Sequence, residues 1–237
     1  MNLFRYADRP DLLERRDLSR QTFPEFMQHN EPGARWWRFL YDRFPDFQLA
    51  LVEDGELVAE GHSLPVPWDG SLDDLPSGWS EAFERGMTSD RPATVLSALA
   101  ISVHPRQQGR GLAARMLEAF RHAARAAGLT DLIAPVRPTW KERYPLIPIE
   151  RYQGWRREDG SHFDPWLRIH ERIGGEIIAP APDSMELVAP VADWEEWTGM
   201  RFPDDGAYVF PGGLAPLEVR DGVGRHVEPN VWVRHRL

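Results

Sequence analysis

The chain has 237 residues, a formal net charge of −9 at pH 7, 42% hydrophobic and 27% charged residues, and no cysteine. Such a composition is typical of a globular protein with one sizeable core. The acidic balance argues against general nucleic-acid binding, and the lack of cysteine excludes disulfides and thiolate chemistry. No apolar run is long enough to cross a membrane, and the N-terminus has no secretory apolar core. We therefore expect a cytoplasmic protein without a membrane partner.

The first third of the sequence predicts a short strand, three helical stretches and a hairpin. The strand is expected at 2–6, and the helical stretches at 10–21, 24–29 and 34–44. The hairpin strands are expected at 47–52 and 56–63, because Asp54-Gly55 between them suits a tight turn. Residues 65–92 are rich in Pro, Gly, Asp and Ser and are interpreted as an inserted loop with one helix at 80–87.

The middle of the chain carries the clearest pattern. The apolar run 94–103 predicts a buried strand, and 131–136 predicts another. Between them, residues 111–127 have apolar side chains at helical spacing on one face, with Gly128 as a stop signal. The order is therefore strand, turn, helix, strand.

The next helix has two candidates in the sequence. One begins near Thr139, includes Tyr144, and is cut short by prolines. The other is 164–173, where Asp164 suits the N-cap and Gly174 the end; we prefer this one. Strands are expected further along at 176–180 and 185–188, a short helix at 193–198, and short strands such as 230–235.

A glycine-rich turn joins the central strand to its helix. Residues 103–114 read VHPRQQGRGLAA. A helix start presents free N–H groups that hold phosphate, and Gly109 and Gly111 let the backbone approach an anion closely. The turn is not a P-loop, because no Gly-Lys-Ser/Thr follows. It also departs from the strict dinucleotide fingerprint, since Ala114 occupies the last glycine position.

The turn resembles the acyl-CoA-binding turn of the GNAT superfamily of N-acetyltransferases. That family's pattern, Gln/Arg-x-x-Gly-x-Gly/Ala, fits residues 108–113 and, two residues earlier, 106–111; we prefer the first register. The resemblance implies an α+β fold, with a mixed central sheet flanked by helices, in one domain over residues 1–237. Segments 65–92 and 137–163 would be insertions and 190–237 a C-terminal extension.

The resemblance also implies the reaction. An acetyl or other short acyl group would pass from acyl-CoA to an amine of a small-molecule acceptor by direct attack, without a metal. The central strand would pair with the pantetheine arm and the turn would hold the pyrophosphate. The cofactor-binding residues implied in this way are Ile101, Ser102, Val103, Gln108, Gly109, Arg110, Gly111, Leu112 and Ala113.

The catalytic acid and base are less clearly indicated. The family often places a tyrosine four residues before a glycine, as the acid that protonates the leaving thiolate; here that position is His170. Tyr144 is the rival acid, and Tyr152 a weaker one. For the base, the candidates are Glu60 and His62 on the preceding strand and Glu150 in the 137–163 segment.

Two other functions stay open at this point. One is an aminoacyl-tRNA-dependent transferase on the same fold, for which Arg15-Arg16, Arg156-Arg157, Arg234 and Arg236 could contact phosphates. The other is a non-catalytic CoA-binding or interaction module. The acidic composition and the intact turn favour the acetyltransferase. We expect the 137–163 segment, with Trp155, to line the acceptor site, and we leave open a homodimer.

Overall fold

The computed structural model describes residues 1–15 and 18–237. Over these residues a nine-stranded mixed sheet runs through the molecule, with the strand order β1-β2-β3-β4-β5-β9-β8-β7 and β6 paired with β9. The strands are β1 (Asn2–Arg5), β2 (Gln48–Glu53), β3 (Glu56–Val66), β4 (Val95–Val103), β5 (Asp131–Val136), β6 (Glu176–Pro190), β7 (Gly206–Tyr208), β8 (Leu217–Arg220) and β9 (Val223–Arg236). The α-helices are α1 (Leu18–Thr22), α2 (Glu31–Trp36), α3 (Leu40–Arg43), α4 (Trp79–Thr88), α5 (Leu112–Ala126), α6 (Ile149–Tyr152), α7 (Pro165–Arg172) and α8 (Val191–Thr198).

The N-terminal helical stretches are shorter and more irregular than the sequence predicted. The expected helix at 10–21 includes residues 16 and 17, which lie outside the described residues; the parts on either side are a 3-10 helix at Pro10–Arg15 and α1. The stretch at 24–29 is a 3-10 helix, and the stretch at 34–44 divides into α2, a 3-10 turn and α3. Asn30 caps α2 by accepting a hydrogen bond from Gly33, so this helix begins before the predicted start.

The predicted hairpin is confirmed. Asp54 and Gly55 adopt φ values of 52° and 84°, the left-handed conformations that a tight hairpin turn requires. β3 continues three residues beyond the predicted end at Ser63, because it pairs with β4 as far as Val66. Pairing with a neighbouring strand thus outweighs the turn-forming tendency of Pro65.

β4 has different partners on its two edges. Along one edge it is antiparallel to β3 from Val95 to Val103, with a bulge at Leu99. Along the other edge it is parallel to β5 over three residues only, and Ser97 opposite Ile133 is the last pair. Beyond that pair β5 remains bound to β9 as far as Val136. The two parallel strands therefore separate after Ser97.

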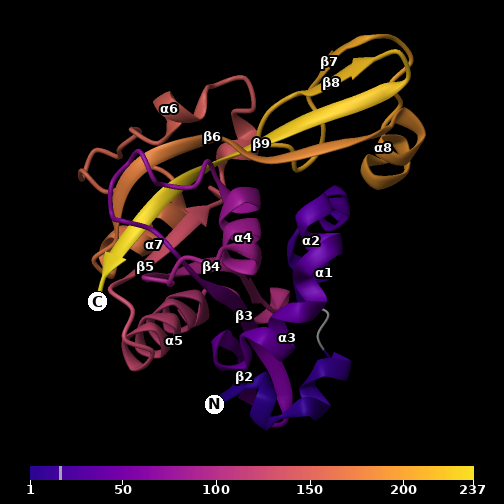
Figure 1. Cartoon of the computed structure of the whole chain (residues 1–237). Helices are drawn as coiled ribbons and strands as arrows, with labels where there is room; N and C mark the ends of the chain where they lie inside the picture. Colours follow the sequence, from indigo (N-terminus) through magenta and orange to yellow (C-terminus); the bar gives the residue numbers. More distant parts are fainter. Residues whose placement is uncertain (16–17) are drawn as a thin grey trace.

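Helices cover both faces of the sheet (Figure 1). α5 packs against β3 and β4 so closely that a Cβ atom on Gly61 would lie 2.6 Å from the ring of Phe120. This close approach explains why glycine occupies the strand at that point. α4 packs on the opposite face, where Trp79 and Phe83 join a second large buried apolar cluster.

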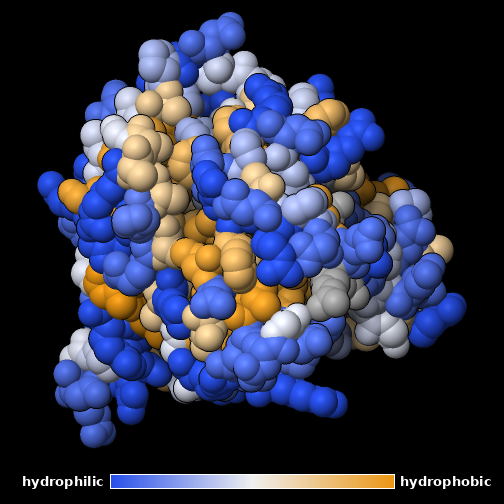
Figure 2. All heavy atoms as spheres, turned by 90° about the horizontal axis from the view of Figure 1, so that it is seen from below, coloured by the Kyte–Doolittle hydropathy of each residue, from blue (hydrophilic) through white to orange (hydrophobic). Residues whose placement is uncertain are grey.

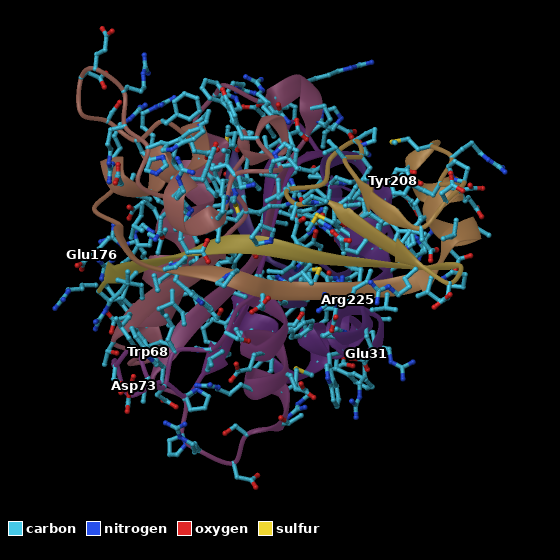
Figure 3. All side chains as sticks on the ribbon, turned by 90° about the horizontal axis from the view of Figure 1, so that it is seen from above. Glu31, Trp68, Asp73, Glu176, Tyr208 and Arg225 are labelled. Carbon is cyan, nitrogen blue, oxygen red and sulfur yellow. The ribbon has the colours of Figure 1, made fainter. Side chains whose placement is uncertain are left out.

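The end of the chain differs most from the sequence-based expectation. Where short, interrupted strands were predicted, β6 and β9 form one long antiparallel pair. Figure 3 shows these strands crossing the molecule side by side, from Glu176 at one end toward Arg225 at the other. A shift in register between Ala181 and Met185 accommodates Pro182, whereas Pro180 stays paired with Val231. β9 also pairs with β5, so the residues after 190 complete the central sheet.

After β5, the structure resolves the choice between two helices. The stretch near Thr139 is only a 3-10 turn, Lys141–Arg143, which ends before Pro145. The helix predicted at 164–173 is present as α7, and the Asp164 side chain caps it by accepting hydrogen bonds from the backbone of Trp166 and Leu167. The same carboxylate accepts hydrogen bonds from the Trp140 amide and the Tyr152 hydroxyl, which ties the 137–163 segment to α7.

Candidate active site

The separation of β4 from β5 leaves one edge of β4 open. Ile101, Ser102 and Val103 pair with β3 on the other edge, and β5 has no pair with them in the described structure. The Leu99 carbonyl at the bulge accepts a hydrogen bond of 2.8 Å from the Trp79 indole. An extended ligand with amide groups could add to this edge as a further strand would.

The predicted cofactor turn lies at the end of β4. Gly109 and Gly111 have φ values of 78° and 75°, and a Cβ atom on either would meet nothing within 4 Å. Gly111 is the N-cap of α5, and no side chain of the described residues caps this helix start. The amides of Leu112 and Ala113 therefore belong to an uncapped helix N-terminus beside open space, which fits a pyrophosphate.

Arg110 holds the turn in place. Its guanidinium binds the Glu53 carboxylate at 2.7 and 3.1 Å and also contacts the Gln107 side chain. The hydrogen bond with Arg110 is the main reason that the pKa of Glu53 lies below its usual value. Because this guanidinium is already paired, we expect the backbone of the turn to supply the anion contacts.

Glu60 lies in a buried polar network on the face opposite α5. Its side chain accepts hydrogen bonds from the Tyr6 hydroxyl at 2.7 Å and the Ser19 amide at 3.1 Å, and His62 Nε2 is 3.7 Å away. Burial raises the pKa of Glu60, but the contacts with His62, Tyr6 and Ser19 together bring it below the ordinary value. Glu60 is therefore a carboxylate at neutral pH.

The tautomer of His62 follows from its neighbour Gln48. The Gln48 amide nitrogen donates to the carbonyls of Phe44 and Ser63, so its oxygen faces His62 Nδ1 at 3.2 Å. His62 Nδ1 must then carry a hydrogen, and Nε2 faces Glu60. The network thus orients the imidazole toward the carboxylate.

Tyr144 belongs to an aromatic cluster formed by the 137–163 segment. Its ring lies 5.0 Å from that of Trp155 and 5.8 Å from that of Phe163, between ring centroids. Tyr152 is fully buried, and its hydroxyl donates to Asp164 at 2.9 Å; burial raises its pKa far above the usual range. Tyr152 is therefore too weak an acid to protonate a thiolate. Tyr144, by contrast, is only half-buried.

His170 is buried between α7 and β9. Its Nδ1 lies 2.8 Å from His235 Nε2, so one ring donates to the other. Burial, with a smaller contribution from His235, holds the pKa of His170 well below 6.5; burial also lowers the pKa of His235 to about 4. Both imidazoles are neutral at pH 7.

The structure does not bring the three catalytic candidates together. Glu60 lies on the face covered by the N-terminal helices, where Tyr6 packs. Tyr144 and the residues around His170 pack into the apolar cluster that contains α5.

Two residues that no sequence pattern singled out also shape this region. Trp79 holds the bulge of β4, although it lies in the stretch interpreted as an inserted loop. Glu228 on β9 is fully buried and binds Arg137, the residue after β5, at 2.5 Å and His226 at 2.6 Å. Arg137 is 91 residues away from Glu228 in the sequence, so only the fold brings this pair together.

An open cavity of about 400 Å³ lies beside the segment that follows β5. Its walls come from the 141–150 segment, the irregular part of β6 at 182–183, residues 215–216 before β8, and residues of β9. Glu150 and Asp183 both line it. On the underside of the molecule, where Figure 1 places α5 and β2, Figure 2 shows apolar side chains at the centre, ringed by hydrophilic ones.

The arginines considered for RNA contact are mostly paired with acids. Arg156 binds Glu171 at 2.6 Å and Arg234 binds Asp131 at 2.7 Å. Arg16 and the Arg15 side chain lie outside the described residues. Among residues 1–15 and 18–237, no helix is long and apolar enough to span a membrane, and no group of three or more potential metal ligands is present.

Comparisons with known proteins give the family. Residues 13–143 match the model of the acetyltransferase (GNAT) family. The arginine N-acetyltransferase avaD of Aspergillus versicolor is 30% identical over 270 residues, covering 98% of this chain and 92% of the relative.

Two solved structures show the same fold. The loading GNATL domain of CurA from Lyngbya majuscula superposes with a TM-score of 0.65 at 20% identity, over 99% of this chain and 96% of that chain. The GphF GNAT-like decarboxylase, in complex with isobutyryl-CoA, gives 0.62 at 18% identity, over 100% and 99%.

The family match and the relative aligned over nearly the whole chain thus define the class of protein, an acetyltransferase. The chain belongs to the GNAT acetyltransferase family and is an N-acetyltransferase. The α+β fold expected from the turn is confirmed.

The cofactor turn can be tested with a matched pair of glycines on α5. Gly111 begins the helix at φ 75° and Gly128 follows its end at φ 73°, both beside open space. Valine at either position should cost similar backbone strain. We expect Gly111→Val to lose the thermal shift given by acetyl-CoA and Gly128→Val to keep it. Equal shifts for the two variants would refute the assignment of the turn.

The neutral histidine pair predicts a pH dependence of stability. Because the folded-state pKa values of His170 and His235 lie below 6.5, the unfolded chain binds protons that the folded chain does not. The contribution of the two neutral histidines to the free energy of unfolding is therefore fully present above pH 6.5. It is lost as the pH falls toward 4, because the unfolded chain takes up protons first. We expect His170→Gln to lose less unfolding free energy than wild type between pH 7 and 5, by up to about 1.4 kcal/mol per pH unit below 6.5. Parallel pH profiles in denaturant titrations would show that His170 titrates normally.

Proposed function

We propose that this N-acetyltransferase moves an acetyl group from acetyl-CoA to an amine of a small molecule, with arginine as the first acceptor to test. The observation that carries the proposal is the open edge of β4 leading to two left-handed glycines at an uncapped helix start. Ile101, Ser102 and Val103 would pair with the pantetheine arm, and residues 108–113 would hold the pyrophosphate. The family relative named for arginine supports the choice of acceptor.

Acetyl-CoA supplies the acyl group, and the acceptor nitrogen bonds to the acyl carbon as the carbon–sulfur bond breaks. The protein must remove a proton from the nitrogen and return one to the sulfur. We assign the base to Glu60, because it is ionised and lies opposite Ser102 of β4 in the strand register. General-base catalysis of this kind contributes about 10²–10⁴-fold in rate.

We assign the acid to Tyr144 in preference to His170. A neutral imidazole is a far weaker proton donor than imidazolium, and burial keeps His170 neutral. Tyr144 follows the C-terminal end of β5, on the side where the two strands separate. Lys141 holds the Tyr144 carbonyl at 2.9 Å and the Leu214 carbonyl at 2.6 Å, which fixes the backbone that carries the phenol.

For the acceptor, we propose the cavity beside the 137–163 segment. Glu150 and Asp183 on its walls are exposed carboxylates, and neither is in an ion pair within the described residues. Two carboxylates suit the planar guanidinium of arginine. The aminoacyl-tRNA alternative has less support, because Arg156 and Arg234 are already neutralised by acids.

The test is release of CoA thiol from acetyl-CoA with a panel of amines, including arginine and its uncharged analogue citrulline, with products identified by mass spectrometry. We expect acetylation of arginine by wild type. Glu60→Gln and Tyr144→Phe should lower kcat by about 10²–10⁴-fold, and His170→Gln should retain it.

Melting temperatures and acetyl-CoA affinity are measured for each variant as controls. If acetyl-CoA binds and no amine is acetylated, the proposed function is wrong. A large fall in kcat for His170→Gln at unchanged stability would transfer the acid role to His170.

A further inference from the structure

Ser97 occupies a special place on β4. It forms the last pair with β5, opposite Ile133, so the open edge of the strand begins at this residue. Ser97 is fully buried, and its hydroxyl has no hydrogen-bond partner among the described residues. Leaving a buried hydroxyl unpaired destabilises the folded state, because the lost hydrogen bonds to water are not replaced. Such a group in a folded protein calls for an explanation.

The surroundings of Ser97 give no structural reason for a hydroxyl. Its register neighbours are Leu64 on β3 and Ile133 on β5, and both are fully buried in one apolar cluster. Val95 and Leu99, two residues away on either side, belong to the same cluster. Alanine would fill this position in the fold without an unpaired polar atom.

Two buried serines on other strands of the sheet have partners. Ser63 on β3 donates to the Phe47 carbonyl at 3.1 Å, and Ser184 on β6 donates to the Asn230 side chain at 2.5 Å. In the described part of the chain, the two buried serines without a partner are Ser97 and Ser102. Both serines lie on β4, the strand with the open edge. We therefore connect their unpaired hydroxyls with the acetyl-CoA that is proposed to bind along that edge.

We propose that Ser97 is a catalytic residue that donates its hydroxyl hydrogen to the carbonyl oxygen of the acyl group. The inference rests on the proposed function. There, the phosphate end of acetyl-CoA lies at residues 108–113, and its arm runs back along the open edge of β4. The thioester is at the end of the pantetheine arm, and the open edge of β4 ends at Ser97. The thioester therefore lies beside Ser97.

A donor at this point has a defined effect on the reaction. As the amine bonds to the acyl carbon, negative charge develops on the carbonyl oxygen. A hydrogen bond in a dry, apolar setting stabilises that charge more than it stabilises the uncharged carbonyl. Removing one such donor lowers kcat by about 10²–10³-fold in other acyl-transfer enzymes.

The kinetic test compares Ser97→Ala with Ser63→Ala. Ser97→Ala should lower kcat by about 10²-fold, with the acetyl-CoA KM nearly unchanged and a melting temperature equal to or above that of wild type, because an unpaired polar group is removed. Ser63→Ala loses a hydrogen bond to Phe47, so it should melt earlier and keep its kcat per folded molecule. Wild-type kcat in Ser97→Ala would overturn the proposal.

A second measurement does not depend on turnover. Acetyl-CoA labelled with ¹³C at the carbonyl is bound without an acceptor, and its NMR shift is compared between wild type and Ser97→Ala. A hydrogen bond from Ser97 should move the wild-type resonance downfield of the variant resonance. Equal shifts would overturn the role of Ser97. If no amine is acetylated but the shifts differ, the proposed function fails and the contact with Ser97 stands.

Discussion

The limited pairing of β4 with β5 is the constraint on which the candidate site depends. Two parallel strands in a sheet normally stay paired along their common length, because unpaired backbone groups inside a protein are costly. Here the pairing ends at Ser97 and Ile133, while β9 holds β5 and β3 holds β4. Each strand is thus fixed by its outer neighbour, so the open edge is built into the sheet.

Other features of the molecule maintain or use this open edge. The Trp79 indole binds the Leu99 carbonyl at the bulge. The long β6–β9 pair anchors β5 from the far side, and buried Glu228 on β9 binds Arg137 just after β5. At the end of β4, two glycines with positive φ turn the backbone into the uncapped start of α5. Together, these features keep the backbone groups along one edge of β4 unpaired. That edge leads to the N-terminus of α5.

Patterns within a short stretch of sequence were sufficient to predict the turn, α5, β5 and the capped α7, because each depends on neighbouring residues. The features that sequence could not give depend on residues distant in the chain. β9 reads as interrupted by Gly224 and Pro229, yet pairing with β5 and β6 makes it one strand. The burial of His170 against His235 depends on a pair 65 residues apart, so its neutral state was not visible in the helix pattern. The unpaired hydroxyl of Ser97 likewise required knowledge of both neighbouring strands.

We propose that the open edge of β4 and the following turn bind acetyl-CoA. Hydrogen exchange measured by mass spectrometry, with and without acetyl-CoA, tests it most directly, because backbone amides are the groups concerned. We expect slower exchange in peptides covering 98–103 and 108–114, with β7 and β8 unchanged. Unchanged exchange in both of those segments under saturating acetyl-CoA would contradict it.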